Sequence, residues 1–234
     1  MILSLALLAA TTQTAIAQQS DRQNAFERGI ELYAQGQYKR AISEFQESLP
    51  EFGPNYAQAL YNIGVCYYEL GQIDEAVIWY GQAIKAKSGN YVAALYALGV
   101  ALDDLGKFND SKPLFVHAVK LSRERHAPSL FRLGLALHRE GDIEAAAVIY
   151  KKAISRSGGH MPNGHNNLGV VKALLGDLNG AEREFDLAIR QAGGQFEDAI
   201  HNLNLCRSMK ANSSRTLVAR FNVTSSESVN TGRQ

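Results

Sequence analysis

A pattern of residues that recurs every 35 positions constrains the fold of this chain more than any other feature. Two glycine positions, one small-residue position and one aromatic position each return five times in the same register. The glycine columns are Gly29, Gly64, Gly99, Gly134 and Gly169, and Gly36, Gly71, Gly106, Gly141 and Gly176. The small column is Ala41, Ala76, Ser111, Ala146 and Ala181, and the aromatic column is Phe45, Tyr80, Phe115, Tyr150 and Phe185. Columns that agree over five copies indicate an internal repeat.

Each repeat has the pattern of two helices joined by a tight turn. Apolar residues recur three and four positions apart before the second glycine and again directly after it. The second glycine therefore ends the first helix in a left-handed conformation. The first glycine lies within that helix, where glycine costs about 1 kcal/mol relative to alanine. We expect the paired helix to cross there, with its small residue against the glycine. Pro113 predicts that its helix starts late, around Asp110 or Ser111.

This pattern resembles the tetratricopeptide repeat family over about residues 22–192, with a unit of 35 instead of the usual 34 residues. The resemblance implies an all-α fold, a right-handed α-solenoid of five helix-turn-helix repeats plus a C-terminal capping helix. The expected boundaries within 22–195 are approximately 22–56, 57–91, 92–126, 127–161 and 162–196. The capping helix is expected at 196–211 and a disordered tail at 212–234. Within the tail, Leu217, Ala219, Phe221 and Val223 alternate as in a peptide-like segment, but an unstructured tail is the favoured interpretation.

The N-terminus has most features of a signal peptide. Residues 2–10 are apolar, and Ala15 and Ala17 are small residues where a signal peptidase would cut. No basic residue precedes the apolar run, which departs from the usual pattern. We predict a signal peptide at residues 1–17, a periplasmic or secreted chain, and no stable membrane insertion after cleavage. The alternative is an uncleaved anchor.

Composition and motifs exclude several functions. With 24 basic and 23 acidic residues the net charge is +1, so no nucleic-acid partner is expected. The sequence contains no phosphate-binding loop, zinc-protease helix or nucleophile elbow, so we predict no catalytic residue, no cofactor and no enzyme. His160, His165 and His201 are the best metal candidates, but they lack a nearby carboxylate or thiol pattern, so no metal site is expected. Cys66 and Cys206 read as buried apolar residues.

Binding of a protein or peptide remains as the function. The resemblance implies that first helices line a concave face that receives peptide segments. The predicted groove residues are Phe26, Tyr33, Tyr61, Tyr68, Tyr96, Asp103, Asp104, Phe131, His138, Arg139, Asn166 and His201. The family's clamp for an acidic chain end is matched only by Asn62 and Arg132, so a chaperone-tail receptor is not expected.

We therefore predict a protein-protein interaction scaffold of the bacterial envelope. Three alternatives stay open. The groove columns could simply pack against the next repeat. The chain could be a structural assembly subunit that self-associates or bridges complexes through its convex face and tail. The aromatic column could also bind a small ligand.

Overall fold

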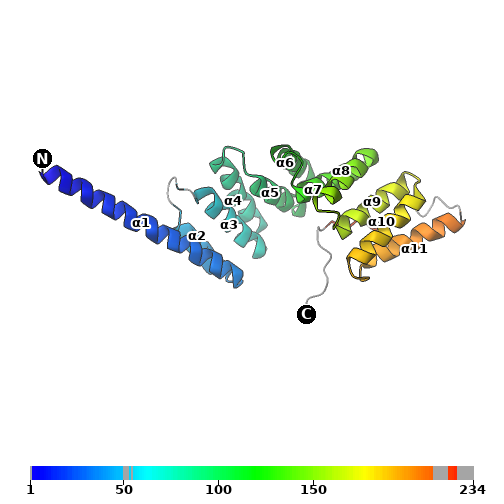
Figure 1. Cartoon of the computed structure of the whole chain (residues 1–234), viewed down its shortest axis with the longest axis horizontal. Coiled ribbons are helices and arrows are strands. Elements are labelled where there is room, and N and C mark those ends of the chain that lie inside the picture. The colour runs from blue at the N-terminus through cyan, green and yellow to red at the C-terminus, as the bar shows by residue number, and fades with distance from the viewer. Residues whose placement is uncertain (1, 50–52, 54, 213–220, 226–234) are drawn as a thin grey trace. The chain divides into compact units, whose positions relative to one another are not determined.

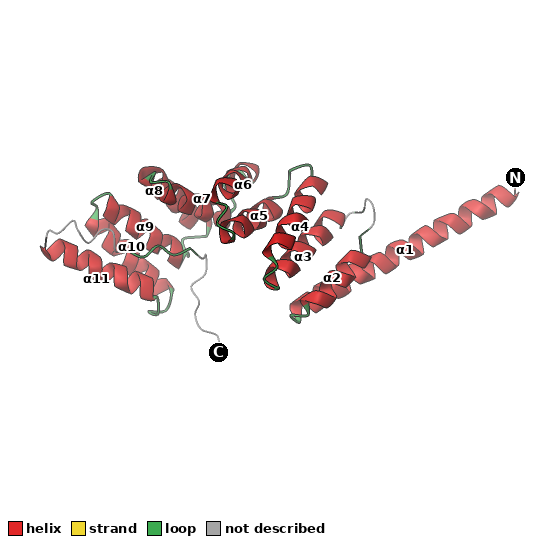
Figure 2. Cartoon of the chain, turned by 180° about the vertical axis from the view of Figure 1, so that it is seen from behind, coloured by secondary structure: helices red, strands yellow, loops and turns green. Residues whose placement is uncertain are grey.

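The structure, a computed structural model, describes residues 2–49, 53, 55–212 and 221–225, with backbone alone for 2–17 and 212. This part of the chain contains eleven α-helices and no β-strand, which confirms the predicted all-α fold (Figures 1 and 2). The helices are α1 (Ile2–Ala34), α2 (Tyr38–Glu47), α3 (Tyr56–Glu69), α4 (Ile73–Ala86), α5 (Val92–Asp104), α6 (Phe108–Leu121), α7 (Ala127–Arg139), α8 (Ile143–Arg156), α9 (Pro162–Leu174), α10 (Leu178–Gln191) and α11 (Glu197–Asn212).

Four pairs of consecutive helices pack together, and four second helices also pack on the helix that follows them. The pairs α1–α2, α3–α4, α7–α8 and α9–α10 are in contact, as are α2 with α3, α4 with α5, α8 with α9 and α10 with α11. The chain divides into two compact units, Met1–Ser111 and Lys112–Gln234, which we describe separately as unit 1 and unit 2. Their boundary falls within α6.

The five turn glycines take the left-handed conformation that the sequence predicts. Their φ angles are 72° at Gly36, 73° at Gly71, 72° at Gly106, and 84° at Gly141 and Gly176. After each glycine, the next N–H donates to a carbonyl five residues earlier, as from Gln72 to Tyr67 at 2.9 Å. This closes the last turn of each first helix and explains the second glycine column.

The glycines within the first helices make room for an aromatic ring, which differs from our expectation. A Cβ added at Gly64 would lie 2.7 Å from the ring of Tyr80, and one at Gly169 would lie 2.6 Å from Phe185. Gly29 and Gly134 stand in the same relation to Phe45 and Tyr150. The column of small residues is fully buried but does not supply these nearest contacts. The glycine and aromatic columns are therefore one packing motif, since the bare backbone seats the ring.

The helix that contains Pro113 starts earlier than the sequence predicted. α6 begins at Phe108, and the N–H groups of Asp110 and Ser111 both donate to the Lys107 carbonyl at 3.1 Å. The Ser111 hydroxyl also donates to the Asp103 carboxylate at 2.5 Å. Pro113 therefore lies in the second turn of α6, inside the helix, where its missing N–H removes one backbone hydrogen bond. These contacts hold the first turn and allow the helix to extend past the proline.

The two ends of the chain extend beyond the repeats. Residues 2–17, the predicted signal peptide, form the N-terminal half of α1, which runs on beyond the pair with α2 (Figure 1). Among the helices described, none combines the length and apolar character needed to cross a bilayer. At the other end, residues 221–225 are extended and packed on unit 2, unlike the disordered tail expected there. The remaining tail residues, 213–220 and 226–234, lie outside the described part.

Candidate peptide-binding surfaces

Unit 1 carries an apolar groove on its first helices. The groove has a volume of about 330 Å³ and is lined by Ile30, Tyr33, Phe45, Gln58, Tyr61, Asn62 and Val65. Ile30 is 44 % exposed, whereas the ring of Tyr61 packs on Tyr80 and Tyr91 with centroids 5.7 Å and 5.5 Å apart. Burial raises the pKa of Tyr33 and of Tyr61, so both phenols stay neutral and can donate a hydrogen bond at ordinary pH. Two predicted site residues, Tyr33 and Tyr61, therefore line one groove.

The other predicted residues of unit 1 have different surroundings. The hydroxyl of Tyr68 donates to the carboxylate of Asp104, while Asp103 accepts from Ser111 and is half-buried. Tyr96 is also half-buried. Phe26 is only 6 % exposed and its ring packs on Phe45, with centroids 5.7 Å apart. Phe26 is thus a core residue, for which the packing alternative holds.

Unit 2 carries a polar site on α9 and α11, with Asn166 at the repeat position that Tyr61 holds in unit 1. Asn166 and Asn167 of α9 and Asn202 of α11 are fully buried, and Asp198 stands one turn before Asn202. We call these four residues the amide site. Residues 221–225 of the chain's own tail, which we call the tail segment, lie against it. The predicted residue Asn166 is therefore placed at a site that holds an extended piece of chain.

The amide site binds the backbone of the tail segment at two alternate residues. Asn202 donates to the carbonyl of Asn222 and accepts its N–H, both at 2.7 Å. Asn167 does the same for Thr224, at 2.7 Å and 2.8 Å. Asn167 and Asn202 are 35 residues apart and so occupy the same position in successive first helices. An extended chain repeats every two residues, and the repeat scaffold supplies one amide per two residues of ligand.

Asn166, Asp198 and Phe185 make the remaining contacts, and most of these reach side chains of the tail segment. Asn166 donates to the Asn222 carbonyl at 3.0 Å and to the Thr224 hydroxyl at 3.1 Å. Asp198 accepts from the Asn222 amide at 3.0 Å and from the Thr224 hydroxyl at 3.3 Å. The ring of Phe221 stacks on Phe185, with centroids 5.9 Å apart and an interplanar angle of 22°. The site thus combines an apolar seat for one residue with a carboxylate that requires donors from two others.

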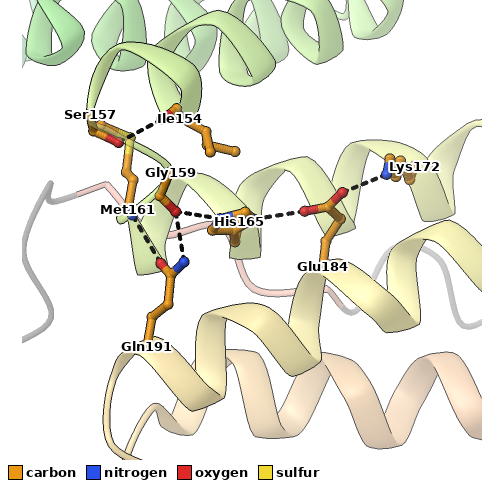
Figure 3. A network of polar contacts seen from close by, with 8 residues as sticks. All are labelled: Ile154, Ser157, Gly159, Met161, His165, Lys172, Glu184 and Gln191. Carbon is orange, nitrogen blue, oxygen red and sulfur yellow. Dashed lines mark hydrogen bonds and ion pairs between the residues drawn. The ribbon is translucent and has the colours of Figure 1, made fainter.

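A buried ionic network connects α9 with α10 and with the loop before α9 (Figure 3). His165 donates from Nδ1 to Glu184 at 2.7 Å, and Lys172 donates to the same carboxylate at 2.6 Å. Nε2 of His165 lies 3.2 Å from the carbonyl oxygen of Gly159, which also accepts from Gln191 at 2.7 Å. Burial raises the pKa of Glu184, but the hydrogen bonds from His165 and Lys172 outweigh burial and hold that pKa below its ordinary value. The network ties α9, α10 and the preceding loop together, directly beside Asn166.

The other predicted residues of unit 2 have different surroundings. Phe131 is fully buried and packs on Tyr150, with ring centroids 5.9 Å apart, so it is a core residue like Phe26. His138 is half-buried, its Nδ1 makes no hydrogen bond, and burial lowers its pKa. Arg139 and His201 are exposed.

Sequence reasoning missed Asn167, Asn202 and Asp198 as binding residues, although a signal was present. Asn62, Arg132, Asn167 and Asn202 fall in one column at multiples of 35 residues. Asn62 and Arg132, the two residues that match the clamp for an acidic chain end, share their repeat position with Asn167 and Asn202. An amide that recurs at one repeat position on a binding face predicts contact with a ligand backbone.

The described residues contain no cluster of metal ligands, and both cysteines are buried. No three of the described His, Cys, Asp and Glu side chains come together as a metal site would require. Of the histidines considered from the sequence, His165 is engaged by Glu184 and Gly159. Cys66 and Cys206 are free and fully buried, as expected, and burial raises the pKa of Cys66 to about 12. Both cysteines are packing residues.

Comparison with known proteins agrees with this architecture. The structure is similar to that of PilF from Pseudomonas aeruginosa, with a TM-score of 0.70 and 17% identity over 88% of this chain and 90% of that one. It is also similar to YrrB, described as a TPR protein with an unusual peptide-binding site, with a TM-score of 0.63 and 23% identity over 81% and 95% of the chains.

MamA from Desulfovibrio magneticus RS-1 gives a TM-score of 0.63 at 19% identity over 75% of this chain and 97% of that one. At such identities these likenesses concern the fold alone. No curated protein sequence matches this chain. The tetratricopeptide repeat profile matches residues 26–91 and 96–162, more than half of the chain. The chain therefore belongs to the tetratricopeptide repeat family.

Proposed function

We propose that this protein is a non-enzymatic scaffold that binds an extended segment of another protein on the faces of its first helices. The observation that carries the proposal is the pair of two-way hydrogen bonds from Asn167 and Asn202 to the backbone of residues 222 and 224. Such bonds recognise the backbone of an extended chain whatever its sequence. Recognition by main-chain hydrogen bonds supplemented by side-chain pockets is a recurring way of binding peptides.

The apolar groove of unit 1 supports a second contact region for the same class of partner. Half-buried tyrosines with an exposed isoleucine beside them are suitable anchors, because aromatic side chains bury much area at low entropic cost. Asp104, which is exposed and accepts from Tyr68, would favour a basic residue in a ligand at that end.

We place this function in the bacterial cell envelope as part of the proposal. The apolar run at residues 2–10 and the small residues Ala15 and Ala17 support export of the chain. N-terminal sequencing of the protein from the organism's envelope fraction tests this. A chain that begins at Gln18 is expected, and one that retains residues 1–17 would contradict cleavage.

A structural assembly role is the second candidate. Ile78 of α4 is 58 % exposed and Val148 of α8 is 53 % exposed, and they hold the same position in their repeats. Exposed apolar residues at one repeated position on the second helices are a possible contact for another copy or another subunit. This reading predicts a mass in solution above that of the monomer.

One binding experiment with matched variants separates the two candidates. The full chain is used to select from a displayed library of random peptides, and selected peptides are measured against Ile30→Ser and Asn167→Ala. We expect each variant to lose about tenfold or more in affinity for peptides that use its unit, since hot-spot truncation commonly costs 2 kcal/mol. Ile78→Ser is the matched control, because it removes an isoleucine from a second helix that is even more exposed than Ile30.

The outcome decides between the readings. Peptide affinity that survives Ile30→Ser and Asn167→Ala would contradict the scaffold proposal. Loss of a higher-mass species in Ile78→Ser, with no peptide selected by the wild type, would establish assembly in its place.

A further inference from the structure

The tail segment occupies the amide site in the way an external ligand would. The polar atoms of Asn167 and Asn202 that face the tail segment are used on its backbone. Thr224 is only 9 % exposed, whereas Val223 between the two bound residues is 40 % exposed. Phe221 packs against a buried cluster that includes Val170, Phe185 and Leu203. The segment therefore has anchor positions at residues 221, 222 and 224 and a free position at 223.

These anchors define the chemistry that the site accepts. The first position needs an aromatic ring to stack on Phe185. The second and fourth positions need hydrogen-bond donors, since Asp198 accepts from both of them. An acidic residue at either position would place two carboxylates together, which is unfavourable. The third position faces outward and is unrestricted in size.

We propose that the tail segment is a built-in competitor of the amide site, displaced by an external extended segment with an aromatic residue followed by hydrogen-bond donors one and three positions later. This inference rests on the proposed function, because it takes the amide site to be a peptide-binding site. It adds the class of ligand and a means of regulating access to it.

The connection between the tail segment and its site determines how strong the competition is. Eight residues, 213–220, join the end of α11 to Phe221. A short connection of this kind gives an effective concentration in the millimolar range. A segment that binds with a dissociation constant of about 100 μM would then keep the site closed about ten times more often than open. Apparent affinity for an external ligand falls by the same factor.

The experiment uses the full chain and a synthetic fluorescent peptide, ARFNVTSS, which copies residues 219–226. Fluorescence anisotropy measures its affinity for the wild type, for Phe221→Ala and for Val223→Ala. Phe221→Ala removes the stacking on Phe185 and is expected to bind the peptide about tenfold more tightly than the wild type. Val223→Ala is the matched control in the same segment and is expected to bind as the wild type does.

Two further variants keep the result clear. Asn222→Pro removes the N–H that Asn202 accepts and should act like Phe221→Ala without touching the apolar cluster. A peptide with aspartate in place of its threonine should bind Phe221→Ala at least tenfold more weakly than ARFNVTSS, because it meets Asp198. Circular dichroism of each protein variant reports that the helices are intact.

The possible failures are distinguishable. Equal affinities for the wild type, Phe221→Ala and Asn222→Pro would contradict the proposal that the tail segment competes for the site. They would not contradict the proposed peptide-binding function. No binding of ARFNVTSS to any folded variant would overturn both. A concentration-dependent dimer of the wild type that Phe221→Ala abolishes would overturn the intramolecular contact, since the tail would then sit on a second copy.

Discussion

The two units present different chemistry on the same repeat positions. In unit 1 the first helices form a groove of Ile30, Tyr33, Tyr61 and Val65. In unit 2 the equivalent face carries Asn166 where unit 1 has Tyr61, and amides hold an extended segment of the chain. The groove of unit 1 is lined mainly by apolar groups, whereas the amide site of unit 2 hydrogen-bonds the backbone of the tail segment. The repeat therefore fixes where a side chain lies, whereas the type of side chain at that place differs between the units.

The two units also differ in the contact between the two helices of a pair. Tyr67 of α3 stacks on Trp79 of α4, with ring centroids 6.4 Å apart and an interplanar angle of 11°. The equivalent positions in α9 and α10 are Lys172 and Glu184, which form a buried ion pair at 2.6 Å. The glycine and the aromatic ring that seats on it are the same in both units. The backbone arrangement thus depends on the glycine columns, and the neighbouring contacts can change from aromatic to ionic.

The largest expected effect comes from the aromatic column. It tests whether the buried ring stabilises both units alike, while the contact with the tail segment belongs to unit 2. Phe45→Ala and Phe185→Ala should each cost about 3–5 kcal/mol in unfolding free energy, because both rings are buried. Only Phe185→Ala should also release the tail segment, since Phe221 stacks on that ring. Denaturant unfolding gives the cost, and hydrogen exchange at Asn222 and Thr224 reports release. Phe185→Leu retains the packing volume better, and exchange that stays slow in it would argue against the stacking contact.

The next prediction compares one repeat position in the two units. Asn202→Ala should destabilise unit 2 by about 2 kcal/mol, because it leaves the N–H of Asn222 without its acceptor and removes one of the two donors to the Asn222 carbonyl. Asn62→Ala removes the equivalent, half-buried amide of unit 1 and should change stability by no more than about 0.5 kcal/mol. Thermal unfolding of both variants checks this. Equal losses would mean that the amide column is structural in both units.

Acid should weaken unit 2 through Glu184. Its folded pKa is lower than the ordinary value of 4.5, so its contribution is fully present above that pH and is lost as the pH falls below it. As the pH falls below 4.5, the unfolding free energy should therefore drop further in the wild type than in Glu184→Gln.

The matched control is Glu44→Gln, at the same repeat position in unit 1. Glu44 pairs with Arg28, whose side chain is 48% exposed, and exposed pairs contribute little. Its acid profile should follow that of the wild type. A Glu184→Gln profile that also matches the wild type would show that the buried network does not govern acid sensitivity.

The smallest expected effect is the same in both units. Gly71→Val and Gly176→Val should each cost about 1 kcal/mol, since a β-branched residue is forced to a φ of 73° or 84°. No atom lies within 4 Å of a Cβ at either position, so the cost comes from the backbone alone. Unfolding midpoints measure it. A cost confined to one unit would show that the two turns are not equivalent.

Much of the fold follows from the sequence because its determinants are local and repeated. The turn glycines, the helix pairs and the burial of the small column were all predicted from spacing. The role of the first glycine column was predicted only in part, because periodicity indicates a close approach without saying which atom makes it. The start of α6 was missed, because its first turn, closed by the bonds from Asp110 and Ser111 to the Lys107 carbonyl, forms despite Pro113.

The binding surfaces were predicted less well. Tyr33 and Tyr61 line a groove as expected, whereas Phe26 and Phe131 of the same column are buried. A single aromatic column cannot distinguish a ring that faces solvent from one that the next helix covers, since both suit the same helical position.

The sequence by itself determined the repeat, because a glycine that must be left-handed and a glycine that must seat a ring are requirements of single positions and their near neighbours. Only the tertiary structure decided that residues 221–225 lie on Asn166, Asn167 and Asn202, which are 20 to 58 residues away along the chain. A short polar segment carries no periodic signal of its own. Its place is set by hydrogen-bonding groups that come together only after the helices of unit 2 have packed.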